Sequence, residues 1–284
     1  MKTNLGISRE LASELQRTLT EVGVDAFRTT GERVSTQSRC LFLTSEHDGR
    51  QFVLKVLNSD YRHNSLEALE REFVALKRFF GVTRECRDIG AAEPLHLFRN
   101  PPAYLMTHVE GVGVGTFLQR HRLSADKIAI LADRVVNGVR IFHASAAGLY
   151  GDFQSENVLV DRWLRISFID PTIPNPAFVE LERRVDWSPM SADLGYWVYS
   201  TSSRGFRQSL HSPLGVLSML RLTTSMVDTA AREHGEANRD DFVNAVYQAA
   251  GFHVRRLKEQ ARLRPKVLAI LTRGLLTVLR AKSR

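Results

Sequence analysis

The chain has 284 residues, of which 43% are apolar and 25% are charged, which is enough for one large domain or for two lobes with their own cores. Its two cysteines form neither a metal-like spacing nor a disulfide framework, and no apolar run is long enough to span a bilayer, so we expect a cytoplasmic protein without a transmembrane segment. The formal net charge of +8 favours a phosphate-bearing partner, although charge alone does not distinguish ATP, RNA and an anionic membrane.

The N-terminal part of the sequence predicts a helix followed by antiparallel strands. Leucines recur at helical spacing over residues 7–22, behind Ser8, which is a suitable N-cap. The strands are predicted at residues 26–28, 40–44 and 51–57, and a hairpin turn at residues 47–50 joins the last two.

Residues 29–38, between the first two strands, are predicted to form a polar loop with one glycine and several hydroxyl groups. Backbone N–H groups and hydroxyls in such a loop can approach a phosphate, and Ser35 and Thr36 are the expected contacts. Taken alone, the segment is explained better as a polar hairpin loop.

Lys55 lies inside an apolar strand, where a lysine is costly unless it is paired. The expected partner is Glu72, in a helix predicted over residues 65–79, and Glu70 on the same helix is a competitor. The alternative is that Lys55 extends into water from an edge strand and that Glu72 is one of many solvated charges on the helix.

Residues 103–111 predict a buried strand that ends in a glycine, and the alternating glycines of residues 111–115 then predict a flexible linker rather than a nucleotide-binding loop. The remaining predicted helices cover residues 116–121, 124–143, about 214–234, about 240–263 and about 265–282.

The last predicted helix has apolar residues on one side and a basic opposite side. We expect the apolar side to pack in the core and the basic side to be solvated, and a nucleic acid or an anionic membrane surface is the partner that this side could bind. The basic residues are Arg262, Lys266, Arg273, Arg280 and Arg284.

The most informative stretch reads Gly151-Asp152, four residues, and then Asn157-Val-Leu-Val, with Ile169-Asp170-Pro171 a short distance later. Phosphoryl transfer needs a carboxylate that orients or deprotonates the attacking hydroxyl, and hard oxygen ligands that hold Mg²⁺. Asp152 suits the first task, and Asn157 and Asp170 suit the second.

These residues resemble the catalytic loop and the metal-binding aspartate of the protein-kinase-like superfamily, in particular its aminoglycoside phosphotransferase and choline kinase branch. The Asp170-Pro171 pair is also similar to small-molecule kinases of the fructosamine kinase type. One departure is Tyr150, which stands where the family usually has His or Arg.

The resemblance implies roles for the candidate residues, with ATP and Mg²⁺ as cofactors. Lys55, held by Glu72, would bind the α- and β-phosphates, and Asp152 would act on the substrate hydroxyl. Asn157 and Asp170 would be the Mg²⁺ ligands.

Two further assignments come from the same resemblance. The strand at residues 103–111 would run into a hinge between the lobes, which would place Thr107, His108 and Val109 near the adenine. Asp193 would brace the catalytic loop without touching substrate, and a role as N-cap of the helix that begins near Ser191 is an alternative of comparable weight.

The fold class implied is α+β, a two-lobed protein-kinase-like fold. Residues 1–110 would form the small nucleotide-binding lobe, an antiparallel sheet plus one helix, with the leading helix also on this lobe. Residues 111–284 would form a large, mainly helical lobe with the catalytic loop, the metal site and the acceptor site.

The expected function is ATP-dependent transfer of the γ-phosphate to a hydroxyl of a small molecule, with Asp152 as catalytic base. The alternatives are a kinase acting on a macromolecule such as RNA, protein or a lipid-linked sugar, and a nucleotide-binding pseudokinase regulator.

Overall fold

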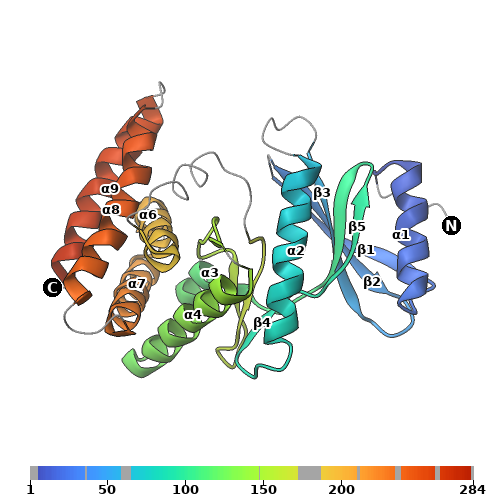
Figure 1. Cartoon of the computed structure of the whole chain (residues 1–284), viewed down its shortest axis with the longest axis horizontal. Helices are drawn as coiled ribbons and strands as arrows, with labels where there is room; N and C mark the ends of the chain where they lie inside the picture. Colours follow the sequence, from blue (N-terminus) through green and yellow to red (C-terminus); the bar gives the residue numbers. More distant parts are fainter. Residues whose placement is uncertain are drawn as a thin grey trace.

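The computed structural model of this chain describes residues 6–35, 37–58, 65–146, 148–171, 187–209, 212–233, 238–259 and 263–282. It shows an α+β fold in which a five-stranded antiparallel sheet occupies one end of an elongated molecule and helices occupy the other end (Figure 1). This arrangement is compatible with the predicted division into two lobes. Within the described residues, no helix has the length and apolar character needed to cross a membrane.

The helices are α1 (Arg9–Glu21), α2 (Leu66–Thr83), α3 (Val114–Arg120), α4 (Ala125–Ala146), α6 (Pro189–Ser209), α7 (Pro213–Glu233), α8 (Arg239–Glu259) and α9 (Leu263–Lys282). The strands are β1 (Phe27–Val34), β2 (Ser38–Ser45), β3 (Gln51–Leu57), β4 (Ile89–Ala91), β5 (Pro94–Arg99), β6 (Pro102–Thr107), β7 (Val112–Gly113), β8 (Val158–Val160) and β9 (Ile166–Phe168).

The five-stranded sheet has the order β1-β2-β3-β6-β5 and is covered by a helix on each face (Figure 1). Because side chains alternate along a strand, Phe52 and Leu54 of β3 pack in the same cluster as the leucines of α1, whereas Val53 packs with Leu69 and Leu76 of α2. Lys55 has the same parity as Val53, so its side chain lies on the α2 face of the sheet.

A smaller sheet of order β4-β9-β8-β7 lies between the large sheet and the helices α6 to α9, with β4 parallel to β9 and the other pairs antiparallel. The predicted boundary between residues 110 and 111 falls between β6 and β7, but the packing crosses it. Phe79 of α2 contacts Phe142 and Phe168, with ring centroids 5.4 and 5.5 Å apart, and β4 pairs with β9. Helix α2 therefore packs against both parts, with Leu69 and Leu76 in a cluster with the five-stranded sheet and Phe79 in the cluster of the C-terminal part.

The prediction of a loop over residues 29–38 is wrong for most of that segment. Thr29 to Val34 continue β1 and pair with β2, with a bulge between Thr29 and Gly31. The strand is at the edge of the sheet and is exposed along most of its length, so it lacks the alternation of apolar residues that marks a half-buried strand.

The prediction of a flexible linker at residues 111–115 is also wrong. Val112 and Gly113 pair with β8, and α3 begins at Val114. A Cβ atom built on Gly113 would lie 2.5 Å from Glu156 Oε2, and one on Gly115 would lie 2.9 Å from Glu156 Oε1. Glycine is therefore needed here for close approach of the backbone to a side chain, not for flexibility.

Candidate functional site

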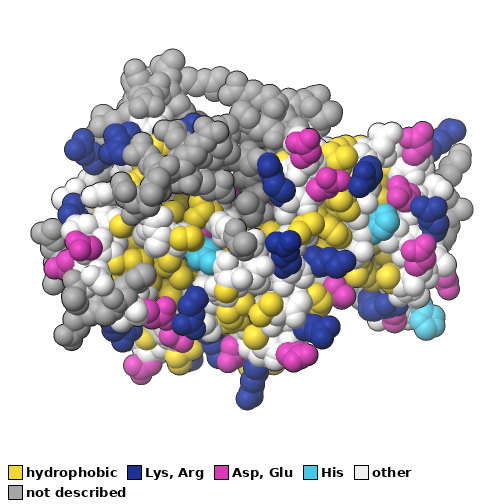
Figure 2. Space-filling view, viewed as in Figure 1, with side chains coloured by type: hydrophobic (Ala, Val, Ile, Leu, Met, Phe, Trp, Pro, Cys, Tyr) yellow, Lys and Arg dark blue, Asp and Glu magenta, His cyan; other side chains and the backbone are white. Residues whose placement is uncertain are grey.

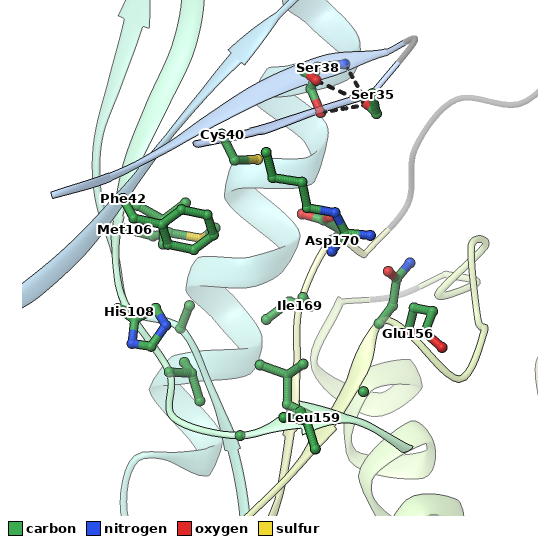
Figure 3. A pocket seen from close by; sticks show the side chains of 18 of the residues that line it. Ser35, Ser38, Cys40, Phe42, Met106, His108, Glu156, Leu159, Ile169 and Asp170 are labelled. Carbon is green, nitrogen blue, oxygen red and sulfur yellow. Dashed lines mark hydrogen bonds between the residues drawn. The ribbon is translucent and has the colours of Figure 1, made fainter. Parts of the chain in front are cut away.

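A cavity of about 440 Å³ lies between the two sheets, a size typical of small-molecule sites. Phe42 and Met106 line one side of it from the five-stranded sheet, and Leu159 and Ile169 line the other side (Figure 3). We refer to the space between these two apolar walls as the slot. Asp152, Asn157 and Asp170 also line the cavity.

Lys55 pairs with two carboxylates that the chain brings from distant positions. Its Nζ donates to Glu72 Oε1 at 2.6 Å and to Asp170 Oδ1 at 3.1 Å. The Tyr104 hydroxyl also donates to Glu72 Oε1, at 2.6 Å. Glu70 instead pairs with the exposed Arg99, so the structure joins Lys55 to Glu72 and not to its competitor.

Burial makes this cluster electrostatically strong, since the side chains of Lys55 and Glu72 are 1% and 3% exposed. Burial alone would lower the pKa of Lys55, but the carboxylates of Asp170 and Glu72 outweigh it and raise that pKa above its ordinary value. Burial raises the pKa of Glu72, and the negative charge of Asp170 adds to the rise, although the ammonium of Lys55 opposes it. Lys55 therefore remains a cation at neutral pH.

Asp152 is held in one orientation by three side-chain donors. Asn157 Nδ2 donates to Asp152 Oδ2 at 2.9 Å, and Gln154 Nε2 donates to the same oxygen at 2.7 Å. The Tyr196 hydroxyl donates to Asp152 Oδ1 at 3.1 Å. The carboxylate thus faces the cavity in a defined position beside Asn157.

Asp193 braces the loop that carries Asp152. Its carboxylate accepts the backbone N–H groups of Tyr150 at 2.8 Å and Gly151 at 3.0 Å, and it is hydrogen-bonded to His143 Nε2 at 2.7 Å. The N-cap alternative is wrong, because Ser188 receives the backbone N–H of Ser191 at the start of α6. Gly151 has a φ of 87°, which a glycine adopts without strain.

Tyr150 connects the Asp152 loop to the strand that leads to Asp170. Its ring is fully buried among Phe142, Phe153 and Phe168, and its hydroxyl donates to the carbonyl of Ile169. Burial, with the charges of Asp170 and Asp152, raises the pKa of Tyr150 well above its ordinary value, so the hydroxyl keeps its proton and remains a donor.

Asn157 precedes β8 and Asp170 follows β9, so both residues lie at the open end of the β8–β9 hairpin, where they line the cavity. The backbone carbonyl of Asn157 accepts the N–H of Ile169 at 3.0 Å, which holds the two segments side by side. Asp170 has a φ of 54°, a left-handed conformation that Asp adopts more readily than most residues, and its side chain reaches Lys55.

Ser35, one of the two residues predicted to contact the phosphates, lies at the β1–β2 turn. Ser35 Oγ donates to the backbone carbonyl of Ser38 at 3.0 Å and accepts the backbone N–H of Ser38 at 3.0 Å. Ser35 and Ser38 both line the cavity (Figure 3). Thr36 lies outside the described residues. The turn is therefore organised by its own serines, and Arg33 of β1 also lines this end of the cavity.

The residues predicted near the adenine, Thr107, His108 and Val109, all line the cavity. The N–H of Thr107 is bonded to the carbonyl of Glu93 and that of His108 to the carbonyl of Gln51, each at 2.9 Å. For Val109, no backbone partner is found within the described part of the chain. Burial lowers the pKa of His108, which favours a neutral imidazole beside the slot.

Tyr104, Tyr196 and Glu156 are among the side chains of the site that were not anticipated from the sequence. Tyr104 is the β6 partner of Lys55 in the sheet register, and only the pairing of the strands places it near Glu72. Tyr196 follows Asp193 by three residues in a helix, a spacing that puts both on one face and that could have identified it. Glu156 directly precedes Asn157 and lines the cavity.

The basic side of the last predicted helix is described only in part. Leu276 and Leu279 of α9 are buried in the core, and Arg273 and Arg280 are exposed. Arg280 donates to Asn244 Oδ1 at 2.6 Å. The side chain of Lys266, like Arg262 and Arg284, lies outside the described residues. The described part of α9 packs in the core through Leu276 and Leu279.

The candidate site thus brings together Lys55, Glu72, Asp152, Asn157 and Asp170, which come from four separate segments of the chain: β3, α2, the loop before β8 and the segment after β9. No protein-family model matches the sequence, and a search of curated proteins gave no match.

Proposed function

We propose that this protein is an ATP-dependent phosphotransferase with a two-lobed protein-kinase-like fold, which moves the γ-phosphate to a hydroxyl of a small molecule. One observation carries the proposal: Asp152, Asn157 and Asp170 line a single cavity, and Asp170 is paired with the buried Lys55. Such a cavity offers oxygen ligands for a metal and an oriented carboxylate together, with the cation of Lys55 next to Asp170.

The adenine would occupy the slot between Phe42 and Met106 on one side and Leu159 and Ile169 on the other. Apolar walls with a few polar groups are the usual form of a nucleotide-base site. The backbone of Val109 is the group best suited to hydrogen-bond the base edge, because the neighbouring N–H groups already have partners.

The phosphates would then point toward Lys55. This lysine stays charged and is held by Glu72, which itself receives the Tyr104 hydroxyl, so the ammonium is positioned before a nucleotide arrives. Arg33 adds a second cation at this end of the cavity.

Asn157 and Asp170 fit a magnesium ion by the chemistry of their donors. The amide nitrogen of Asn157 donates to Asp152, which leaves the amide oxygen as the atom available to a metal, and Asp170 supplies a carboxylate. No group of three or more His, Cys, Asp or Glu suited to a metal is found within the described residues. Bound Mg²⁺ would neutralise charge that develops on the transferred phosphoryl group.

Asp152 would accept the proton of the substrate hydroxyl, or orient that hydroxyl toward the γ-phosphate. Its hydrogen bonds from Asn157, Gln154 and Tyr196 fix the carboxylate, and Asp193 fixes the backbone that carries it. Fixed geometry of this kind is the main contribution that a protein makes to phosphoryl transfer.

The test measures nucleotide turnover with Mg²⁺ and γ-labelled ATP or GTP, in the presence of pooled small metabolites or of RNA. Asp152→Asn should lower transfer by at least a hundredfold and leave nucleotide affinity within about threefold. The matched control is Asp133→Asn, an exposed aspartate on α4, which should retain full activity. Label that moves only to RNA would favour the macromolecular kinase, whereas tight nucleotide binding without transfer would favour the regulator. No nucleotide binding at all would refute the proposed site.

A further inference from the structure

A second hollow, of about 490 Å³, is formed by the connection from α3 to α4 together with the β8–β9 turn. None of its lining residues lines the cavity described above. Its polar and aromatic lining consists of Arg120, His121, Arg122, Lys127, Arg162 and Trp163. We infer that this hollow binds a single-stranded nucleic acid, with phosphates on the basic side chains and a base stacked on Trp163.

The first support is a concentration of positive charge that acidic neighbours do not cancel. Arg120, Arg122, Lys127 and Arg162 come from three segments, and within the described residues no ion pair joins any of them to a carboxylate. The carboxylate of Asp161 is directed into the turn, where it accepts the backbone N–H groups of Trp163 at 2.8 Å and Arg165 at 2.9 Å. The amino end of α4, next to Lys127, adds a positive potential.

The second support is an aromatic ring presented on a rigid turn. Trp163 is 59% exposed, and the guanidinium carbon of Arg162 lies 3.9 Å from its ring centroid. Arg134 of α4 fixes the turn by donating to the carbonyl of Leu164 at 2.7 Å and to Asp88 Oδ1 at 2.8 Å. An exposed ring that does not need to be ordered on binding is a favourable stacking platform for a base.

The shape of the site favours a flexible polyanion over a bilayer. The cations surround a hollow, so a flat anionic membrane would meet only its rim, whereas a single strand can place successive phosphates inside it. On the face shown in Figure 2, basic and acidic side chains are interspersed over the described surface. The positive net charge of the chain is therefore not by itself evidence for a binding site. Unpaired cations next to an exposed aromatic ring are the usual combination in single-strand binding sites.

The test uses fluorescence anisotropy of a labelled 12-nucleotide oligouridine at several salt concentrations. Arg120→Ala with Arg122→Ala should weaken binding about tenfold and reduce the salt dependence of log K by about one unit, because up to two phosphate contacts are lost. The matched control removes two other exposed arginines, Arg17 and Arg84, which are 69% and 63% exposed, and should change affinity less than twofold. Trp163→Ala should weaken binding at least fivefold, and Trp163→Phe should retain most of it.

Three outcomes would overturn this inference. Equal losses in the two double variants would show that only net charge matters. Binding to phosphatidylserine vesicles without binding to oligouridine would assign the hollow to a membrane, and competition by pyrophosphate as strong as that by oligouridine at equal phosphate concentration would assign it to a small anion. Asp152→Asn should leave oligouridine binding unchanged, so this result is separable from the failure or success of the phosphotransferase proposal.

Discussion

Replacing Glu72 by glutamine tests whether this carboxylate is the partner that allows Lys55 to be buried. Removing one member of a buried ion pair typically costs 3–5 kcal/mol. Lys55 keeps its contact with Asp170, whose side chain is 26% exposed, so we expect the lower end of that range, about 3 kcal/mol. For a chain of this length, 1 kcal/mol corresponds to roughly 2–4 °C in Tm, which predicts a fall of about 6–12 °C.

Glu70→Gln is the matched control, because it makes the same chemical change two residues away on the same helix. Glu70 pairs with Arg99 in a setting where the side chains are 34% and 76% exposed, and exposed pairs of this kind contribute little. We therefore expect its Tm to stay within about 2 °C of the parent protein. The measurement is thermal unfolding followed by circular dichroism without nucleotide.

A double-mutant cycle makes the test independent of the absolute values. Lys55→Met alone leaves two carboxylates facing each other without a cation, whereas Lys55→Met with Glu72→Gln removes the charge of both partners. The double variant should therefore be more stable than the sum of the single losses predicts, by about 2 kcal/mol. Additive losses, or equal melting of Glu72→Gln and Glu70→Gln, would refute the view that the pair determines the burial of this lysine.

Two further predictions concern the support of the site and its thiol. Asp193→Ala should lower the free energy of unfolding, measured by urea denaturation, by at least about 3 kcal/mol, because the buried N–H groups of Tyr150 and Gly151 lose a charged acceptor. Asp193→Asn keeps one side-chain oxygen and should lose less stability. Equal losses in the two variants would contradict this prediction. Burial raises the pKa of the Cys40 thiol to about 11. In a Cys86→Ser variant, the rate of alkylation of Cys40 by iodoacetamide should therefore be low at pH 8 and rise about tenfold per pH unit up to pH 10. A rate that levels off by pH 9 would contradict this prediction.

The helices and the central hairpin could be predicted because their signals are local. Ser8 accepts a backbone N–H group at the start of α1, as its sequence position indicates. The turn at residues 47–50 is also confirmed, with Ser45 N–H bonded to the carbonyl of Arg50. Each of these features depends on residues a few positions apart, which is why the sequence alone was sufficient.

Features that depend on contacts between distant segments were not predictable in the same way. Gly113 is required by the side chain of Glu156, 43 residues later, and nothing near Gly113 in the sequence distinguishes close approach from flexibility. The Tyr104 hydroxyl reaches Glu72 only after β6 pairs with β3. Conversely, the pairing of Lys55 with Glu72 was predicted despite its separation. A lysine inside an apolar strand needs a partner, and the resemblance to the kinase family favoured Glu72 over Glu70.

Tyr150 is the position where the sequence departs from the family pattern that it resembles, and its surroundings explain how the departure is tolerated. An arginine or a protonated histidine would place a charge among Phe142, Phe153 and Phe168, which is costly in an apolar environment. The tyrosine fills that space, and its hydroxyl donates to the carbonyl of Ile169, immediately before Asp170. A neutral side chain therefore joins the loop that carries Asp152 to the strand end that carries Asp170. Because this connection is intact, Tyr150 is compatible with the phosphotransferase activity that we propose.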